Sequence, residues 1–286
     1  MSGFVRSAIR GIIKLITLTG LLKFLTTEAF MLIRPSIKLH AQYTLKSTLL
    51  KSMDSIPNLT LPPPPPLIIC GPSGVGKGTL LSKAIFSSTS LLLPSPFSFS
   101  TSHTTRLPRF GETDGLEYNF VLPSFFQSNR HLFLETATVH GNEYGTTFKA
   151  VRDVRERNLI CVLDLDVQGV KTLKRGIQST EQQQQQQQQQ TENKTNNFEM
   201  FLGSKFIFIT PPSFSTLEKR LLNRNTETSE TLKLRLENAK SEIEYGTEEG
   251  VFDEIIVNDD VEKATEKLAD VIEKLYPDQR LERRKQ

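Results

Sequence analysis

The sequence predicts an α/β protein, in which helices flank a parallel sheet, from two kinds of observation. Continuous apolar runs are typical of strands buried on both faces of a parallel sheet, and they occur at residues 67–70, 159–165, 205–210 and 252–259. Segments with apolar residues at helical spacing lie between these runs or after them, most clearly at residues 261–275. The 286 residues, of which 37% are hydrophobic, suffice for one large domain of this class.

A glycine-rich turn follows the first apolar run and precedes a helix expected over residues 77–88. The turn reads Gly71-Pro72-Ser73-Gly74-Val75-Gly76-Lys77-Gly78-Thr79. A strand, a glycine loop and a lysine at a helix start form a phosphate-binding P-loop, whose N–H groups and Lys77 bind phosphate. In the usual P-loop pattern a Ser or Thr follows the lysine directly. Here Gly78 follows Lys77 and the hydroxyl comes one residue later, at Thr79, which leaves open how Mg²⁺ is held. The alternative, an ordinary glycine-rich turn, explains the lysine less well.

The first 60 residues differ from the rest of the chain in charge. They carry eight basic and two acidic residues, whereas the remainder of the chain carries 27 basic and 30 acidic residues. The slightly acidic remainder does not suggest a nucleic-acid surface. Arg6, Arg10 and Lys14 share one face of a possible helix, as in organelle transit peptides, and a cytosolic extension is the alternative. No stretch is long and uncharged enough for a membrane span. Residues 61–66, mostly proline, are interpreted as a stiff linker.

Two further patterns indicate anion and metal chemistry. Arg106 and Arg109 flank a proline, and arginine forms bidentate bonds with phosphate. Asp164 and Asp166 lie at the carboxyl end of a predicted strand, where Mg²⁺ and substrates bind in open α/β sheets. Asp166 also suits a helix N-cap. The two cysteines lie in apolar runs and indicate neither a disulfide framework nor a metal site.

Several motifs follow one another in a fixed order over about residues 67–275. They are Gly-Pro-Ser-Gly-x-Gly-Lys from residue 71, Ser-x-Thr-Thr-Arg-x-Pro-Arg-x-Gly-Glu from 102, Gly-x-x-Tyr-x-Phe from 115, Gly-Asn-x-Tyr-Gly-Thr from 141 and Leu-Asp-x-Asp-x-Gln-Gly from 163. In this order they resemble the guanylate kinase family of P-loop nucleoside-monophosphate kinases. The Lys-Gly-Thr ending of the P-loop also occurs in that family.

The resemblance implies phosphorylation of GMP by ATP with Mg²⁺, and it implies a domain over about residues 67–276. Within it we expect a small mixed-sheet GMP-binding part at 98–147 and a helical lid at 211–246. A Gln-rich insertion at 176–204 is expected to be disordered, because it is too polar to bury a core. A charged tail, 277–286, follows the domain. The expected binding partners are ATP and GMP, and the chain is expected to be a monomer.

When the family's site residues are assigned to this chain motif by motif, the GMP site contains phosphate-binding and base-reading residues. The phosphate group would contact Arg106, Arg109, Tyr118 and Tyr144, and Glu112 is a further residue expected to bind GMP. The guanine edge would contact Ser102, Glu135, Thr146 and Asp164. Guanine presents N1–H and N2–H donors, for which a carboxylate is the matching acceptor.

The remaining expectations concern ATP and the transferred phosphoryl group. The P-loop and Asn258 would bind ATP, while Thr79 and Asp166 would hold the metal, directly or through water. Lys77, Arg109, Arg224 and Arg235 are the candidate catalytic residues, and Arg220 is a further lid arginine. The alternatives are a non-enzymatic binding module, from which such residues are typically missing, and another nucleoside-monophosphate kinase, which the motif order disfavours.

Overall fold

The computed structural model describes residues 63–93, 95–109, 111–139, 141–186, 197–223, 229–279 and 281–284. The predicted N-terminal extension, with its candidate transit peptide, lies outside these residues. No helix among them is long and apolar enough to span a membrane.

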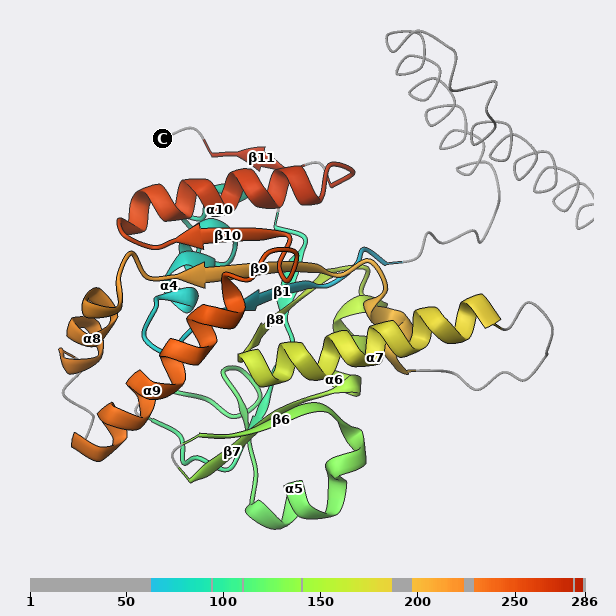
Figure 1. The fold of residues 1–286 in the computed structure, drawn as a ribbon. Coiled ribbons are helices and arrows are strands. Elements are labelled where there is room, and N and C mark those ends of the chain that lie inside the picture. The colour runs from blue at the N-terminus through green and yellow to red at the C-terminus, as the bar shows by residue number, and fades with distance from the viewer. Residues whose placement is uncertain are drawn as a thin grey trace, which may run out of the picture. The chain divides into compact units, whose positions relative to one another are not determined.

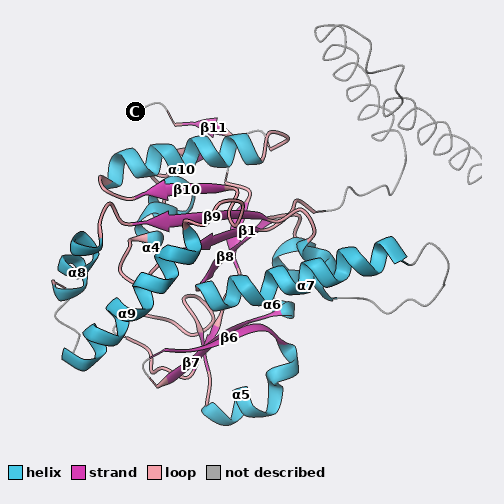
Figure 2. Ribbon diagram, viewed as in Figure 1, coloured by secondary structure: helices cyan, strands magenta, loops and turns pink. Residues whose placement is uncertain are grey.

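The core is a five-stranded sheet in which every pairing is parallel (Figures 1 and 2). In spatial order its strands are β10 (Glu254–Val257), β9 (Lys205–Thr210), β1 (Leu67–Cys70), β8 (Ile160–Leu165) and β3 (Phe97–Phe99). Four of the five were predicted from their apolar runs, and the α/β prediction is confirmed. β3 was missed because three residues are too few to show a period.

Helices cover both faces of this sheet. Along β1, Leu67 and Ile69 join one hydrophobic cluster, whereas Ile68 and Cys70 join another. The first cluster is completed by α4 (Lys77–Leu81), the π-helical turn η1 (Ser82–Phe86) and α10 (Val261–Leu275). The second is completed by α6 (Phe148–Glu156) and α7 (Val167–Gln186). A strand buried on both faces has no polar face, which explains the continuous apolar runs in the sequence.

A smaller, four-stranded sheet lies within the predicted GMP-binding part. Its order is β5 (Asn119–Phe120), β4 (His103–Thr104), β7 (Asn142–Thr147) and β6 (Phe133–Val139). The β4–β5 pairing is parallel and the other two are antiparallel, so the sheet is mixed, as expected. Helix α5 (Pro123–Asn129) and the 3₁₀ turn η2 (Arg130–Leu132) lead into β6.

The predicted lid consists of two helices. Helix α8 (Phe214–Leu222) begins after Ser213, whose Oγ accepts a hydrogen bond from Thr216 N at 3.1 Å. Helix α9 (Ser229–Gly246) packs on it through a small apolar cluster that contains Leu217, Leu221 and Ala239. Arg224 falls between the two helices, outside the described residues.

The expectation of disorder from residue 176 is wrong for both ends of the Gln-rich insertion. Helix α7 continues to Gln186, and the chain returns as a 3₁₀ turn, η3 (Asn197–Phe201). Phe201 is fully buried, and the ring of Phe198 fills the space beside Gly176. Two aromatic anchors in a polar segment therefore order its return to the core. Residues 187–196 are outside the described part.

The predicted linker and the predicted charged tail both dock onto the domain. Arg155 donates to the carbonyls of Pro64 at 2.5 Å and Pro63 at 3.3 Å, and Tyr276 Oη donates to Pro65 O at 3.0 Å. The last prolines are therefore part of the domain rather than a free spacer. The tail forms β11 (Glu282–Arg283), which pairs antiparallel with β2 (Leu92–Leu93).

Candidate active site

The glycine-rich turn has the predicted strand–loop–helix conformation. Gly76 has a φ of 98° at the start of α4, in the left-handed region that favours glycine. Gly71 is needed for a different reason, because a Cβ there would lie 2.2 Å from the carbonyl oxygen of Ile209. The loop is therefore held tightly against the carboxyl ends of β1 and β9, with its lysine at the first position of the helix.

Lys77 reaches across this loop. Its Nζ donates to Gly71 O at 2.6 Å and lies 3.6 Å from Asp164 Oδ1. Asp164 was expected at the guanine edge, and the structure places it beside the P-loop lysine. Burial raises the pKa of Asp164, and the positive charge of Lys77 acts in the opposite direction. The carboxylate therefore lies beside the P-loop lysine, and its contact with guanine stays a prediction.

Asn258 supports the P-loop from β10. Its side chain is buried, and Nδ2 donates to Val75 O at 2.7 Å. A Cβ at Gly76 would lie 2.6 Å from the same Nδ2. The contact of Asn258 with ATP stays a prediction, and its side-chain amide fixes the backbone of the loop. It is a positioning residue in this structure.

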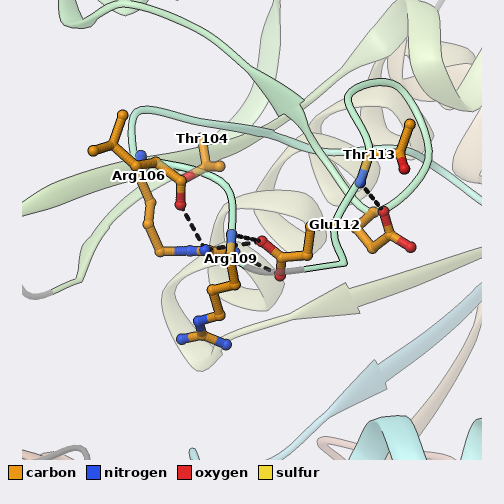
Figure 3. A network of polar contacts seen from close by, with 7 residues as sticks. Thr104, Arg106, Arg109, Glu112 and Thr113 are labelled. Atoms are coloured by element: carbon orange, nitrogen blue, oxygen red, sulfur yellow. Dashed lines mark hydrogen bonds and ion pairs between the residues drawn. The ribbon is translucent and has the colours of Figure 1, made fainter.

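The two arginines of the anion clamp have different surroundings (Figure 3). Arg106 forms a bidentate pair with Glu112, with both N···O distances 3.0 Å. Its side chain is 14% exposed and that of Glu112 is 17% exposed, so the pair is well shielded. This hydrogen bonding lowers the pKa of Glu112 and raises the pKa of Arg106. Glu112 also accepts from Arg109 N at 2.7 Å, while the guanidinium of Arg109 extends away from the network.

Glu112 was predicted to bind GMP, and this geometry gives it a different role. A carboxylate that orients Arg106 and the Arg109 backbone would repel a phosphate if it touched one. The ring of Tyr118 lies under the Arg106 guanidinium at 5.6 Å, and Tyr144 meets Tyr118 edge to face at 5.9 Å. The clamp therefore contains the four predicted phosphate contacts, and Glu112 holds two of them in place.

Three of the predicted base-reading residues meet around Thr146 of β7, with Glu135 on the neighbouring strand β6 and Ser102 just before β4. Glu135 Oε1 accepts from Thr146 N at 2.8 Å, and the Thr146 and Ser102 hydroxyls lie 2.9 Å apart. Burial raises the pKa of Glu135 to about 7, although the hydrogen bond from Thr146 acts to lower it. With Oε1 engaged, Oε2 is the oxygen left to meet a donor.

A sequence model of the family described as guanylate kinase matches residues 64–201 and 199–275. The chain belongs to the guanylate kinase family. Among its relatives, a guanylate kinase of Sus scrofa is 43% identical over 70% of this chain and 88% of its own length. Guanylate kinase 1 of Oryza sativa is 42% identical over 71% of this chain, and a Schizosaccharomyces pombe guanylate kinase is 38% identical over 71%.

The lengths of these relatives differ. The match covers 87% of the fission yeast protein but only 46% of the rice protein, so the chain spans about half the length of that plant relative. The guanylate kinase match includes both the P-loop and the mixed sheet, so both nucleotide sides of the site lie inside the family domain.

Asp166 begins helix α7 in this member of the guanylate kinase family. Its Oδ1 accepts from Gly169 N at 2.7 Å, the bond of a helix N-cap. Among the described residues, no three His, Cys, Asp or Glu side chains converge to hold a metal ion. Mg²⁺ is commonly bound by one or two carboxylates together with substrate phosphates and water. Asp164, Asp166 and the exposed Thr79 hydroxyl fit that smaller role.

The predicted lid reaches the P-loop through α9. Arg235 Nη1 donates to Ser73 Oγ at 3.4 Å, and Arg220 of α8 donates to Asp259 O at 3.3 Å. Glu242 lies two helical turns after Arg235 and hence on the same face of α9. Burial raises the pKa of Glu242, and the positive charge of Lys77 acts to lower it. Glu242 is therefore close enough to the P-loop lysine to interact with its charge.

Two residues of the site were not identified from the sequence. Glu242 could have been found from its seven-residue spacing to Arg235, which puts both on one helix face. Gly169 stands beside Glu135, and its signal was a glycine inside an expected helix, where glycine is unfavourable. These signals acquire a meaning for the site once each helix is placed against its neighbours.

Proposed function

We propose that the chain transfers the γ-phosphoryl group of ATP to GMP and releases ADP and GDP. The observation that carries this proposal is the base pocket, in which Glu135 stands beside Thr146 and Ser102 within a domain of the guanylate kinase family. A carboxylate accepts from the N1–H and N2–H donors of guanine, whereas adenine presents an acceptor at N1. The pocket therefore favours guanine over adenine.

The P-loop would hold the ATP phosphates. Its N–H groups and the start of α4 supply a concave, positive surface, and Lys77 adds a full charge on the β- and γ-phosphates. Lys77 is already aimed across the loop by Gly71 O and Asp164. Asn258 keeps the loop in shape through Val75. The loop is thus ordered before ATP arrives, which lowers the entropy lost on binding.

The clamp would hold the GMP phosphate. Arg106, fixed by Glu112, gives a rigid bidentate donor, while the extended Arg109 can follow the phosphate toward ATP. Tyr118 and Tyr144 would donate their hydroxyls to the same group. The phosphate oxygen of GMP is already an anionic nucleophile, so the reaction needs no general base.

The transferring group passes between two anions, and positive charge must gather around it. Lys77, Arg109 and Arg235 come from three separate parts of the fold, and Arg224 of the lid is proposed as the fourth cation. Thr79, Asp164 and Asp166 would hold a bound Mg²⁺, directly or through water, and the ion would supply positive charge that offsets the charge of the phosphates. Closure of α8 and α9 would exclude water from the site.

A coupled ADP-release assay on the full chain tests this function. ATP with Mg²⁺ is offered together with GMP, AMP, UMP or CMP in separate reactions. Turnover with GMP alone is expected. Turnover with another nucleotide would retain the P-loop argument but refute the base pocket, and a folded chain that binds GMP without turnover would indicate a binding module.

Compartment and assembly complete the proposal. The basic, acid-poor segment around Arg6, Arg10 and Lys14 supports delivery to a mitochondrion or another organelle, with the cytoplasm as the alternative. Fusion of residues 1–60 to a fluorescent protein distinguishes the two. A monomer is expected in solution, which light scattering tests directly.

A further inference from the structure

The carboxyl group of Glu135 lies where α7 meets the mixed sheet. One of its oxygens accepts from Thr146 N, and the register pairs Glu135 with Thr146 across β6 and β7. The first turn of α7 lies against the same part of β6. The carboxyl therefore has a strand on one side and a helix N-terminus on the other.

Gly169 is the residue of α7 that faces this carboxyl. A Cβ at Gly169 would lie 3.3 Å from Glu135 Cγ and 3.4 Å from Glu135 Oε2. The distance to Cγ is shorter than most contacts of a real Cβ, and the distance to Oε2 is at the short edge of ordinary van der Waals contact, so the Glu135 side chain would have to shift by a few tenths of an ångström. The missing side chain leaves room for the Glu135 side chain beside α7.

The backbone does not require glycine at this position. Gly169 is not among the residues with positive φ, and it is the third residue of a regular helix. Glycine in a helix destabilises it by roughly 0.5–1 kcal/mol relative to alanine. Glu or Gln is often favoured three residues after an N-cap such as Asp166, because its side chain can reach back to the cap. Local structure therefore favours a side chain, and the close approach of Glu135 and of Asp166 Oδ1, which is 3.3 Å from the same Cβ position, opposes one.

We propose that Gly169 is a positioning residue for nucleobase specificity: its lack of a side chain lets Glu135 present Oε2 to the N1–H and N2–H groups of guanine. The inference rests on the proposed function. It adds that the GMP site is adjusted by the core helix α7 as well as by the mixed sheet. A displacement of the carboxyl weakens hydrogen bonds to guanine and leaves the ATP side unchanged.

The first experiment compares the full chain with its Gly169→Ala variant, using GMP and inosine monophosphate, which lacks the 2-amino group. We expect the KM for GMP to rise about tenfold, from partial loss of a charge-assisted hydrogen bond. The KM for inosine monophosphate should rise less, and the KM for ATP should not change. The thermal midpoint should stay equal or increase, because alanine favours the helix. Gln178→Ala, at an exposed position further along α7, is the matched control.

The second experiment is a double-mutant cycle with Glu135→Ala, read as GMP affinity by titration calorimetry. Without the Glu135 side chain a Cβ at Gly169 has nothing to displace there, so Gly169→Ala should have no effect in that background. Additive effects would overturn the proposal, because Gly169 would then act through Asp166, whose Oδ1 lies 3.3 Å from the same Cβ position. An unchanged GMP KM in Gly169→Ala would also overturn it. Failure of the parent chain to phosphorylate GMP would refute the proposed function instead.

Discussion

Burial of Glu135 makes GMP recognition dependent on pH. Burial raises the pKa of this carboxyl to about 7, and the carboxylate of Asp166 adds to the effect. Only the ionised form can accept from both the N1–H and the N2–H of guanine. We therefore expect GMP to bind more weakly as the pH falls through 7.

The size of the effect follows from a single titration. With a pKa of about 7, the ionised fraction of Glu135 is about 0.9 at pH 8 and about 0.1 at pH 6. If GMP binds only the ionised form, its KM rises about tenfold over that interval, which corresponds to about 1.4 kcal/mol of binding free energy.

Initial rates at saturating ATP between pH 6 and pH 8.5 give the KM for GMP. The phosphate of GMP also titrates, with a second pKa of about 6, so the raw profile contains both groups. The Glu135→Gln variant cannot ionise at this position and supplies the baseline. The ratio of the two KM values isolates Glu135, and a ratio that stays constant within about twofold across the range would refute the reasoning.

The folding stability of the ligand-free domain should change with pH in the opposite direction to GMP binding. The folded pKa of Glu135 lies above its ordinary value of 4.5, so the folded state holds the proton more tightly than the unfolded state. The stability that results is fully present below 4.5 and is lost as the pH rises through about 7. GMP binding near neutral pH should then release protons, which calorimetry detects by comparing buffers of different ionisation enthalpy.

Three further substitutions test the site and the fold. Lys77→Met should lower kcat by about 10²–10³ with little change in thermal midpoint, and retention of more than about a tenth of the activity would remove its catalytic role. Glu112→Gln should raise the KM for GMP by about tenfold but not the KM for ATP, because Arg106 loses its bidentate partner; equal rises in both would argue against the positioning role. Arg155→Met should lower the free energy of unfolding by about 1–3 kcal/mol, since carbonyls of Pro63 and Pro64 lose their donors; a denaturation midpoint equal to that of the parent would contradict the docked linker.

The parts of the fold that the sequence predicted are those with strong local patterns. The P-loop and the strands β1, β8, β9 and β10 have runs of several apolar residues or a fixed glycine–lysine spacing. Among the strands that were not predicted, β3 has three residues, and β2, β4 and β5 have two each and owe their extended conformation to their partners. Too few residues carry a period in such strands, so only the pairing reveals them.

The errors arose where a contact joins distant residues. Composition predicts a stiff proline spacer, yet Arg155 and Tyr276, remote in sequence, donate to its carbonyls. The contact of Asn258 with the P-loop was also not predicted, because its partner Val75 is 183 residues away. The Gln-rich insertion did carry a usable signal, since Phe198 and Phe201 are aromatic residues in a polar stretch.

The start of α7 joins the proposed ATP side of the site to the proposed GMP side. Asp164 near the end of β8 lies beside Lys77, Asp166 caps α7, and Gly169 lies beside Glu135. A rise of about 1.5 Å per residue places Asp166 and Gly169 within one helical turn of each other. Phosphoryl transfer by positioning depends on such a short, rigid connection, because a misplacement of about 1 Å can lower the rate about 10²-fold. A motion that brings the GMP side toward ATP must therefore pivot near α7 or carry its first turn along.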